Sequence, residues 1–246
     1  MSIHLAGGGW SSELFIEFLA ECAARAAGAG RAIPRVGVLL VAEGEQAAEE
    51  ARSKYVDMLV AVAPCAPVIT LLEEGESATS SLLTDIDGLL VGGGLTPAYL
   101  VAVTPIIDEI RLLVADGLPY LGFSAGAAIA ADDALIGGWR IDGVPVVNED
   151  NAEDLDEVAV EPGLGLVDLT IEVHAAQWGN LARLIAATAA GLVEGGLGVD
   201  EDTVLIVGDG DLRVSGIGNV WQVRAGDDGV IVTVLGAEIG EAGSLE

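Results

Sequence analysis

Short, mainly apolar runs alternate along this chain with stretches in which apolar positions recur every three or four residues. Residues 36–41 form a continuous apolar run, which is typical of a strand buried on both faces of a parallel sheet. Further strands are expected at the mainly apolar residues 3–6, 67–72 and 86–91. A first helix is predicted by the helical spacing of its apolar residues, which are Leu14, Phe15, Phe18, Leu19 and Cys22. A second helix is expected over residues 46–62. The alternation predicts an α/β fold with a doubly wound, mostly parallel sheet.

The next helix is predicted from its first residues. Thr96 can cap it, and Pro97 then stands at the first helical position, where proline is favoured. Pro105 should interrupt this helix, because proline removes a hydrogen bond from the ladder, and the helix should resume to residue 115. An apolar run from residue 119 to residue 123 then predicts a fifth strand.

Beyond residue 130 the pattern changes. Residues 134–147 predict a β-excursion, and residues 148–157 hold six acids, which we interpret as a solvated loop because their spacing does not match a calcium loop. A strand at 166–173 should precede a helix at 177–190. From residue 203, short strands with turns at 209–210 and 227–229 predict antiparallel strands that close the sheet. No linker is evident, so one domain is expected over residues 1–246.

The composition of the chain argues against some partners and indicates the cell compartment. The chain is 52% hydrophobic but only 4% aromatic, and 39 acidic against 10 basic residues give a formal charge of −29. Such a surface repels phosphate backbones and anionic membranes, so neither is expected as a partner. The two cysteines are expected to be reduced thiols, and the N-terminus lacks a basic, apolar leader. We therefore expect a cytoplasmic protein.

One short motif points to catalysis. Residues 122–126 read Gly-Phe-Ser-Ala-Gly, the pattern of a nucleophile elbow, in which a strand turns sharply into a helix and exposes a serine hydroxyl. Small residues are needed on both sides of Ser124, because the two backbones nearly touch there. A helix that starts directly after Ser124 would also direct free N–H groups toward an oxyanion.

Three loops should converge on this serine. Gly7–Gly9, Gly92–Gly94 and Phe123–Ser124 each follow a predicted strand, and ligands in such sheets gather at the carboxyl ends of the strands. We expect the oxyanion hole to be formed by the N–H of Ala125 together with the N–H of Gly93 or Gly94.

A serine nucleophile needs a base and a carboxylate that orients it. The chain has two histidines. His4 lies inside a predicted strand and is expected to be structural, whereas His174 follows a strand and is the expected base. The candidates for the acid are Asp142, Glu172 and Glu201, and the residues alone leave this choice open.

In four ordered segments the chain resembles the serine peptidases that include cyanophycinase and aspartyl dipeptidase E, relatives of the class I glutamine amidotransferase-like fold. The segments are Gly92–Gly94, Gly122–Ala128, Gly163–Leu166 leading to His174, and Gly198–Thr203. The resemblance implies that Ser124 is the nucleophile, His174 the base and Asp142 the acid, with Gly94 and Ala125 at the oxyanion hole. It also implies a small peptide substrate, no metal or organic cofactor, a possible homodimer, and substrate-binding or supporting roles for Gly93, Thr96, Gln177, Arg183 and Glu201.

The chain departs from this family at positions that concern substrate binding. Trp178 and Asn180 stand where arginines are usual, so that only Arg183 remains, and Leu95 replaces the Asn or Asp that ends the Gly-Gly loop. A pocket with fewer cations should bind a carboxylate-rich substrate less well. Arg140 could supply a replacement cation.

Two other functions are compatible with the residues. In the first, Gly7–Gly9 and Glu43 would bind a nucleotide, although Ser12 occupies the last glycine position of the expected fingerprint and the motif around Ser124 is left unexplained. In the second, the chain is a catalytically silent relative that acts as a binding protein. The expected function is a serine hydrolase, a peptidase that acts on a small peptide through an acyl-enzyme.

Overall fold

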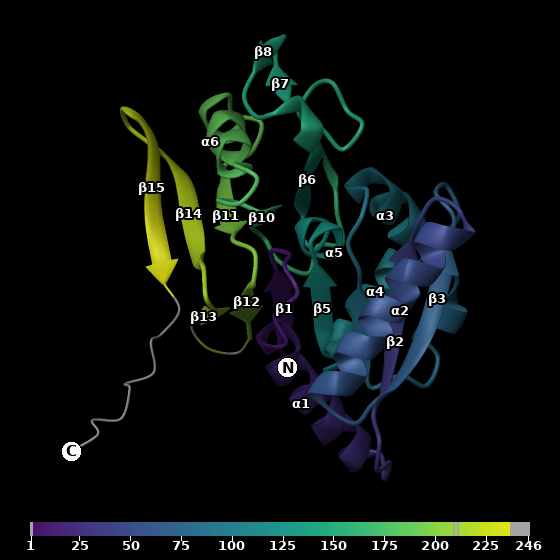
Figure 1. The fold of residues 1–246 in the computed structure, drawn as a ribbon. Coiled ribbons are helices and arrows are strands. Elements are labelled where there is room, and N and C mark those ends of the chain that lie inside the picture. The colour runs from purple at the N-terminus through teal and green to yellow at the C-terminus, as the bar shows by residue number, and fades with distance from the viewer. Residues whose placement is uncertain (1, 209, 211, 237–246) are drawn as a thin grey trace, which may run out of the picture.

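In the computed structural model, which describes residues 2–208, 210 and 212–236, the larger sheet has seven strands in the order β13-β12-β1-β5-β4-β2-β3. The five strands from β1 to β3 in this order are parallel, and at the other side of β1 the sheet continues with β12, antiparallel to β1, and β13, antiparallel to β12 (Figure 1). Their bounds are β1 Ile3–Ala6, β2 Arg35–Val41, β3 Ala66–Leu72, β4 Gly88–Val91, β5 Tyr120–Phe123, β12 Thr203–Val207 and β13 Arg213–Gly216. The predicted doubly wound, mostly parallel sheet is confirmed.

Helices cover both faces of this sheet. On one face, α1 (Glu13–Gly28) and α2 (Glu45–Val62) bury a cluster that includes Phe15, Phe18 and Leu59 against β2, β4 and β5. On the other face lie α3 (Thr96–Val103), α4 (Ile107–Ala115) and the short α5 (Ala125–Ala128). The predicted interruption at Pro105 is confirmed, since a 3-10 turn at Thr104–Ile106 separates α3 from α4. A second 3-10 turn, Ser80–Leu83, precedes β4.

A second sheet of four strands, β10-β11-β14-β15, packs beside the first (Figure 1). It consists of β10 Thr170–Val173, β11 Gly195–Val199, β14 Asn219–Gly226 and β15 Gly229–Gly236, and α6 (Leu181–Ala189) lies on β11 and β14. The sequence did not indicate β11, because three of its five residues are glycines, which are poor strand formers. The expectation that all C-terminal strands close the larger sheet was therefore wrong for the β14–β15 hairpin.

The predicted β-excursion is present between the two sheets. It contains β6 (Asp133–Gly137), which pairs with β9 (Ala159–Pro162), and the small β7–β8 hairpin of Arg140–Ile141 and Val144–Pro145. A 3-10 turn at Glu149–Asn151 follows the hairpin. The predicted turn at 227–229 joins β14 to β15, whereas Asp209, from the other predicted turn, lies outside the described residues.

The core and the thiols fit the aliphatic composition. The largest apolar cluster runs from Leu39 and Leu89 in the first sheet to Leu197 and Val220 in the second. Cys22 is buried, Cys65 is partly exposed, and both are free thiols. In the part of the chain that the structure describes, no helix combines the length and the apolar character needed to cross a bilayer.

Candidate active site

Ser124 stands at a sharp turn between β5 and α5. Its backbone has φ 52° and ψ −110°, a strained conformation for a residue with a side chain. The flanking glycines are required by close approach: a Cβ at Gly122 would collide with the carbonyl of Gly126, and one at Gly126 would collide with the carbonyl of Val91. The local geometry is that of a nucleophile elbow, in which the strand and the helix leave no room for larger residues.

The Gly92–Gly94 loop lies directly against this turn. The Gly126 N–H donates to the Gly92 carbonyl at 3.0 Å, and a Cβ at Gly93 would meet the Cβ of Ser124. The Gly93 N–H is already used, because it donates to the Tyr55 hydroxyl at 2.8 Å. Among the described residues, no acceptor is found for the N–H of Gly94 or of Ala125. These two donors are therefore available to an oxyanion.

The two predicted catalytic side chains meet. The Ser124 Oγ lies 2.8 Å from His174 Nε2, and His174 Nδ1 lies 2.7 Å from Glu201 Oε1. A carboxylate at Nδ1 fixes the tautomer that leaves Nε2 free to accept the serine proton. The arrangement can thus transfer a proton from the hydroxyl to the imidazole.

Three successive carbonyls at the end of β1 hold these elements in place. Each accepts one backbone hydrogen bond of 2.9 Å, and the donors all have φ near 52°. The pairs are Ser124 N–H to Ala6 O, His174 N–H to Gly7 O and Asp202 N–H to Gly8 O. A Cβ at Gly8 would overlap the His174 ring, and one at Gly9 would overlap the Asp202 carboxyl group. The glycines after β1 therefore serve close packing beneath the site.

Burial lowers the pKa of His174 below its usual value, and the neighbouring Glu201 carboxylate opposes this effect in part. The imidazole is consequently neutral near pH 7 and able to act as a base. One face of the ring is covered by Trp178, whose indole stacks on it with centroids 3.8 Å apart and planes 7° apart. This stacking contributes to the burial that lowers the pKa.

The carboxylate beside His174 is Glu201, and the assignment of Asp142 as the orienting acid is corrected by this geometry. Glu201 lies in the turn between β11 and β12, where its N–H donates to Gln177 Oε1 at 2.9 Å. Asp142 lies on the exposed turn between β7 and β8, at the top of Figure 1, with φ 51°. Glu172, the third candidate, is bound by Arg183. The sequence offered Glu201 as a candidate but contained nothing that ranked it first.

Arg183 is buried and does not line the cavity beside Ser124. Its Nε and Nη2 donate to the Glu172 carboxylate at 2.8 and 2.9 Å, Nη1 donates to the carbonyls of Gly138 and Asn151, and the residue is buried. Of the two roles expected for Arg183, substrate binding or support, its contacts favour support. Arg140 likewise forms an ion pair with Asp156 at 2.8 Å.

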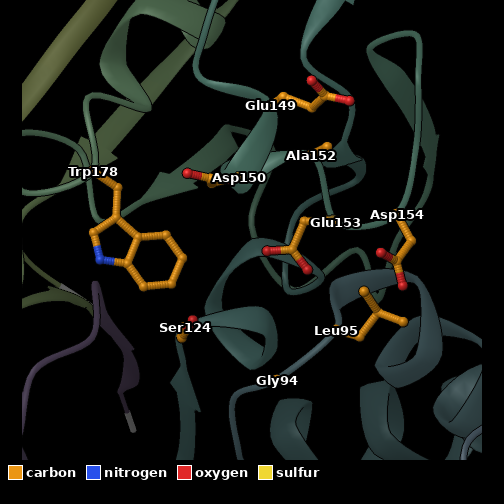
Figure 2. A pocket seen from close by; sticks show the side chains of 9 residues that line it. All are labelled: Gly94, Leu95, Ser124, Glu149, Asp150, Ala152, Glu153, Asp154 and Trp178. Carbon is orange, nitrogen blue, oxygen red and sulfur yellow. The ribbon is translucent and has the colours of Figure 1, made fainter.

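A cavity of about 340 Å³ opens beside Ser124. It is lined by Gly94, Leu95, Ser124, Glu149, Asp150, Ala152, Glu153, Asp154 and Trp178 (Figure 2). Thr96, expected near the substrate, is buried at the start of α3, and its N–H donates to Glu153 Oε2 at 2.8 Å. The acidic segment 148–157, interpreted above as a solvated loop, thus forms one wall of the cavity. Its six acids were the signal that could have indicated this role.

No metal site is evident in residues 2–236, with 209 and 211 left aside, since no three His, Cys, Asp or Glu side chains gather there as ligands. The groups available at the site are the serine hydroxyl, the imidazole, the carboxylate and two backbone N–H groups. Together they can support nucleophilic acyl transfer.

The sequence is similar to a known peptidase family and to several cyanophycinases. Residues 65–215, more than half of the chain and a range that includes Ser124, His174 and Glu201, match the sequence model of peptidase family S51. A cyanophycinase from Synechococcus elongatus is 34% identical over 150 residues, which cover 59% of this chain and 44% of that protein. One from Trichormus variabilis is 33% identical over 151 residues, covering 60% and 46%. The match thus spans less than half the length of these relatives.

Solved structures share the fold. The crystal structure of a peptidase from an acI-B1 Actinobacterium superposes with a TM-score of 0.65 at 17% identity, covering 96% of this chain and 94% of that one. A putative peptidase E protein from Listeria monocytogenes gives a TM-score of 0.53 at 13% identity, covering 88% and 98%. At these identities the likeness concerns the fold alone.

Proposed function

This chain belongs to peptidase family S51, and from that membership we propose that it is a serine peptidase that cleaves small peptides through an acyl-enzyme. The observation that carries the proposal is the continuous chain of hydrogen bonds from Ser124 Oγ through His174 to Glu201. The strained turn at Ser124 and the two unused N–H groups beside it support the same function.

In the proposed reaction, the Ser124 Oγ attacks the carbonyl carbon of the scissile bond while His174 Nε2 takes its proton. The carbonyl oxygen becomes an oxyanion and accepts hydrogen bonds from the N–H groups of Gly94 and Ala125. His174 then gives the proton to the leaving amine, and an acyl-serine ester remains. Water, deprotonated by the same imidazole, hydrolyses the ester and restores the hydroxyl.

Glu201 takes the role that Asp142 was expected to have. Its carboxylate accepts the Nδ1 proton of His174 and stabilises the imidazolium that forms during attack. Gln177 fixes the backbone of Glu201 through the Glu201 N–H, so it is a supporting residue in this proposal. The free state of both cysteines is consistent with a reducing compartment, and we propose the cytoplasm as the site of action.

A fluorophosphonate probe tests the proposed nucleophile. We expect the protein to be labelled at Ser124, and Ser124→Ala and His174→Ala each to abolish labelling and lower peptide turnover by about a thousandfold or more. Ser77→Ala, a change at an exposed serine outside the site, is the matched control and should label as the unaltered protein does.

Labelling, together with melting temperatures, separates the enzyme from the two alternative functions. If the folded protein is not labelled, and the melting temperatures of all variants agree, the chain is a silent relative that acts as a binding protein. A rise in melting temperature with nucleotides would instead support binding at the Gly7–Gly9 loop. Labelling that persists in Ser124→Ala would contradict the assignment of the nucleophile.

A further inference from the structure

The cavity beside Ser124 carries a marked negative charge. Four of its nine lining residues are acidic, namely Glu149, Asp150, Glu153 and Asp154, and none is Lys or Arg. Figure 2 shows the carboxylate of Glu153 in the space between Trp178 and Leu95 and that of Asp150 on the Trp178 side, both above Ser124 and Gly94. A substrate whose scissile bond reaches Ser124 must therefore place neighbouring groups against these carboxylates.

The arginines near the wall offset this charge only in part, because Arg183 attracts the Glu153 carboxylate but is bound by Glu172. Arg183 is engaged by Glu172 and by two carbonyls, Arg140 is paired with Asp156, and neither arginine lines the cavity. Glu153 accepts a hydrogen bond from the Thr96 N–H, and burial raises the pKa of its carboxyl group. A cation placed in the cavity would restore the balance of charge, whereas a substrate carboxylate would be repelled.

An aromatic surface completes the cavity. Trp178 stacks on His174 and is still 45% exposed, so part of its indole remains open to a ligand. Indole faces attract ammonium and guanidinium groups. The carboxylates and the indole of this cavity thus favour the same class of ligand (Figure 2).

We propose that the cavity beside Ser124 binds a cationic group of the peptide substrate, an ammonium or guanidinium, and discriminates against carboxylates. The proposal rests on the proposed function, because the position of Ser124 is what makes the cavity a substrate site. The cation comes either from a basic side chain or from a free amino terminus, since both present the same chemistry to Asp150 and Glu153.

Binding to the Ser124→Ala variant tests this without turnover. Isothermal titration calorimetry at one fixed ionic strength would compare four probes: N-acetyl-lysinamide, norleucinamide, N-acetyl-norleucinamide and N-acetyl-aspartic acid amide. The first carries a side-chain cation, the second a terminal cation, the third no charge and the fourth a carboxylate. We expect at least one cationic probe to bind at least tenfold more tightly than the neutral probe, and the anionic probe to bind most weakly.

Charge-removing variants locate the effect. In the Ser124→Ala background, Asp150→Asn with Glu153→Gln should reduce the preference for the cation to about twofold or less, while leaving the affinity for the neutral probe unchanged. Glu153→Gln retains an oxygen that can accept the Thr96 N–H. Asp57→Asn removes an exposed acid on α2 and controls for general attraction by the acidic surface, so its preference should equal that of Ser124→Ala.

Several results would overturn the inference. These are equal binding of all probes, tightest binding of the anionic probe, or an equal loss of preference in Asp57→Asn. These results test the substrate class, whereas the fluorophosphonate experiment tests catalysis by Ser124. Labelling at Ser124 without a cation preference would retain the peptidase and reject the substrate class, whereas an unlabelled protein that still prefers cations would retain the binding site and reject catalysis.

Discussion

At the scale of single residues, the site depends on backbone conformations that side chains rarely adopt. Ser124, His174 and Asp202 all have φ of 52°, and each donates its N–H to one of three successive carbonyls, those of Ala6, Gly7 and Gly8. Such conformations cost about 1–3 kcal/mol each and persist only where the surroundings enforce them. The end of β1 and the Gly7–Gly9 loop provide these contacts, and close packing against His174 and Asp202 explains the glycines without a nucleotide.

The roles of Glu201 and Asp142 can be separated by two amide substitutions. We expect Glu201→Gln to lower kcat by about a hundredfold to ten-thousandfold, because the imidazole loses the carboxylate that orients it. Asp142→Asn is the matched control and should leave kcat within about twofold, since Asp142 lies on an exposed turn. A large loss in Asp142→Asn with none in Glu201→Gln would reverse the assignment.

The pH profile gives a second measurement on the same pair. Burial lowers the pKa of His174, so the neutral base persists below the usual range and the acidic limb of kcat/KM should lie below about pH 6.5. Glu201 opposes this lowering. Its removal should therefore shift the limb of the residual activity to still lower pH. A shift to higher pH would contradict this account of the pKa.

At the scale of elements, one buried ion pair ties α6 to β10 and to the acidic wall. The Arg183 and Glu172 side chains are 3% and 1% exposed. Arg183 also donates to the carbonyl of Gly138, which precedes segment 148–157, and to that of Asn151, which lies within it. An arginine that appeared suited to a substrate thus serves to hold the excursion against the second sheet.

Breaking this pair should destabilise the protein strongly. We expect Arg183→Met to lower the free energy of unfolding by about 3–5 kcal/mol, because the Glu172 carboxylate is left buried without a partner. The double variant Glu172→Gln with Arg183→Met should recover part of the loss, since no uncompensated charge remains. Urea unfolding measures both. If the double variant had a lower free energy of unfolding than Arg183→Met, the unpaired Glu172 charge would not be the cause of the loss.

At the scale of the whole molecule, the formal charge of −29 acts against compactness. Salt shortens the range of this repulsion, from a Debye length of about 30 Å at 0.01 M to about 3 Å at 1 M. We therefore expect the melting temperature to rise steadily as KCl increases from low to molar concentration. A melting temperature that stays constant or falls would show that self-repulsion does not limit stability.

The parts of the fold that the sequence predicted are those encoded by local periodicity. The parallel strands, the helices between them and the break at Pro105 each follow from apolar spacing or from proline chemistry within one short segment. The second sheet was missed because β11 has glycine in place of apolar side chains and because the partner of the β14–β15 hairpin lies in another part of the chain.

The sequence by itself determined the order of the parallel strands and of the helices between them, and the small residues around Ser124, because these depend on local periodicity and sterics. It also reduced the choice of base to His174, since the chain has only two histidines. Only the tertiary structure decided which carboxylate reaches His174, that Arg183 is internal, and that segment 148–157 lines the cavity. Among 39 acidic residues, which one meets the imidazole depends on where turns from different sheets converge. Such contacts between distant segments leave no periodic signal along the chain.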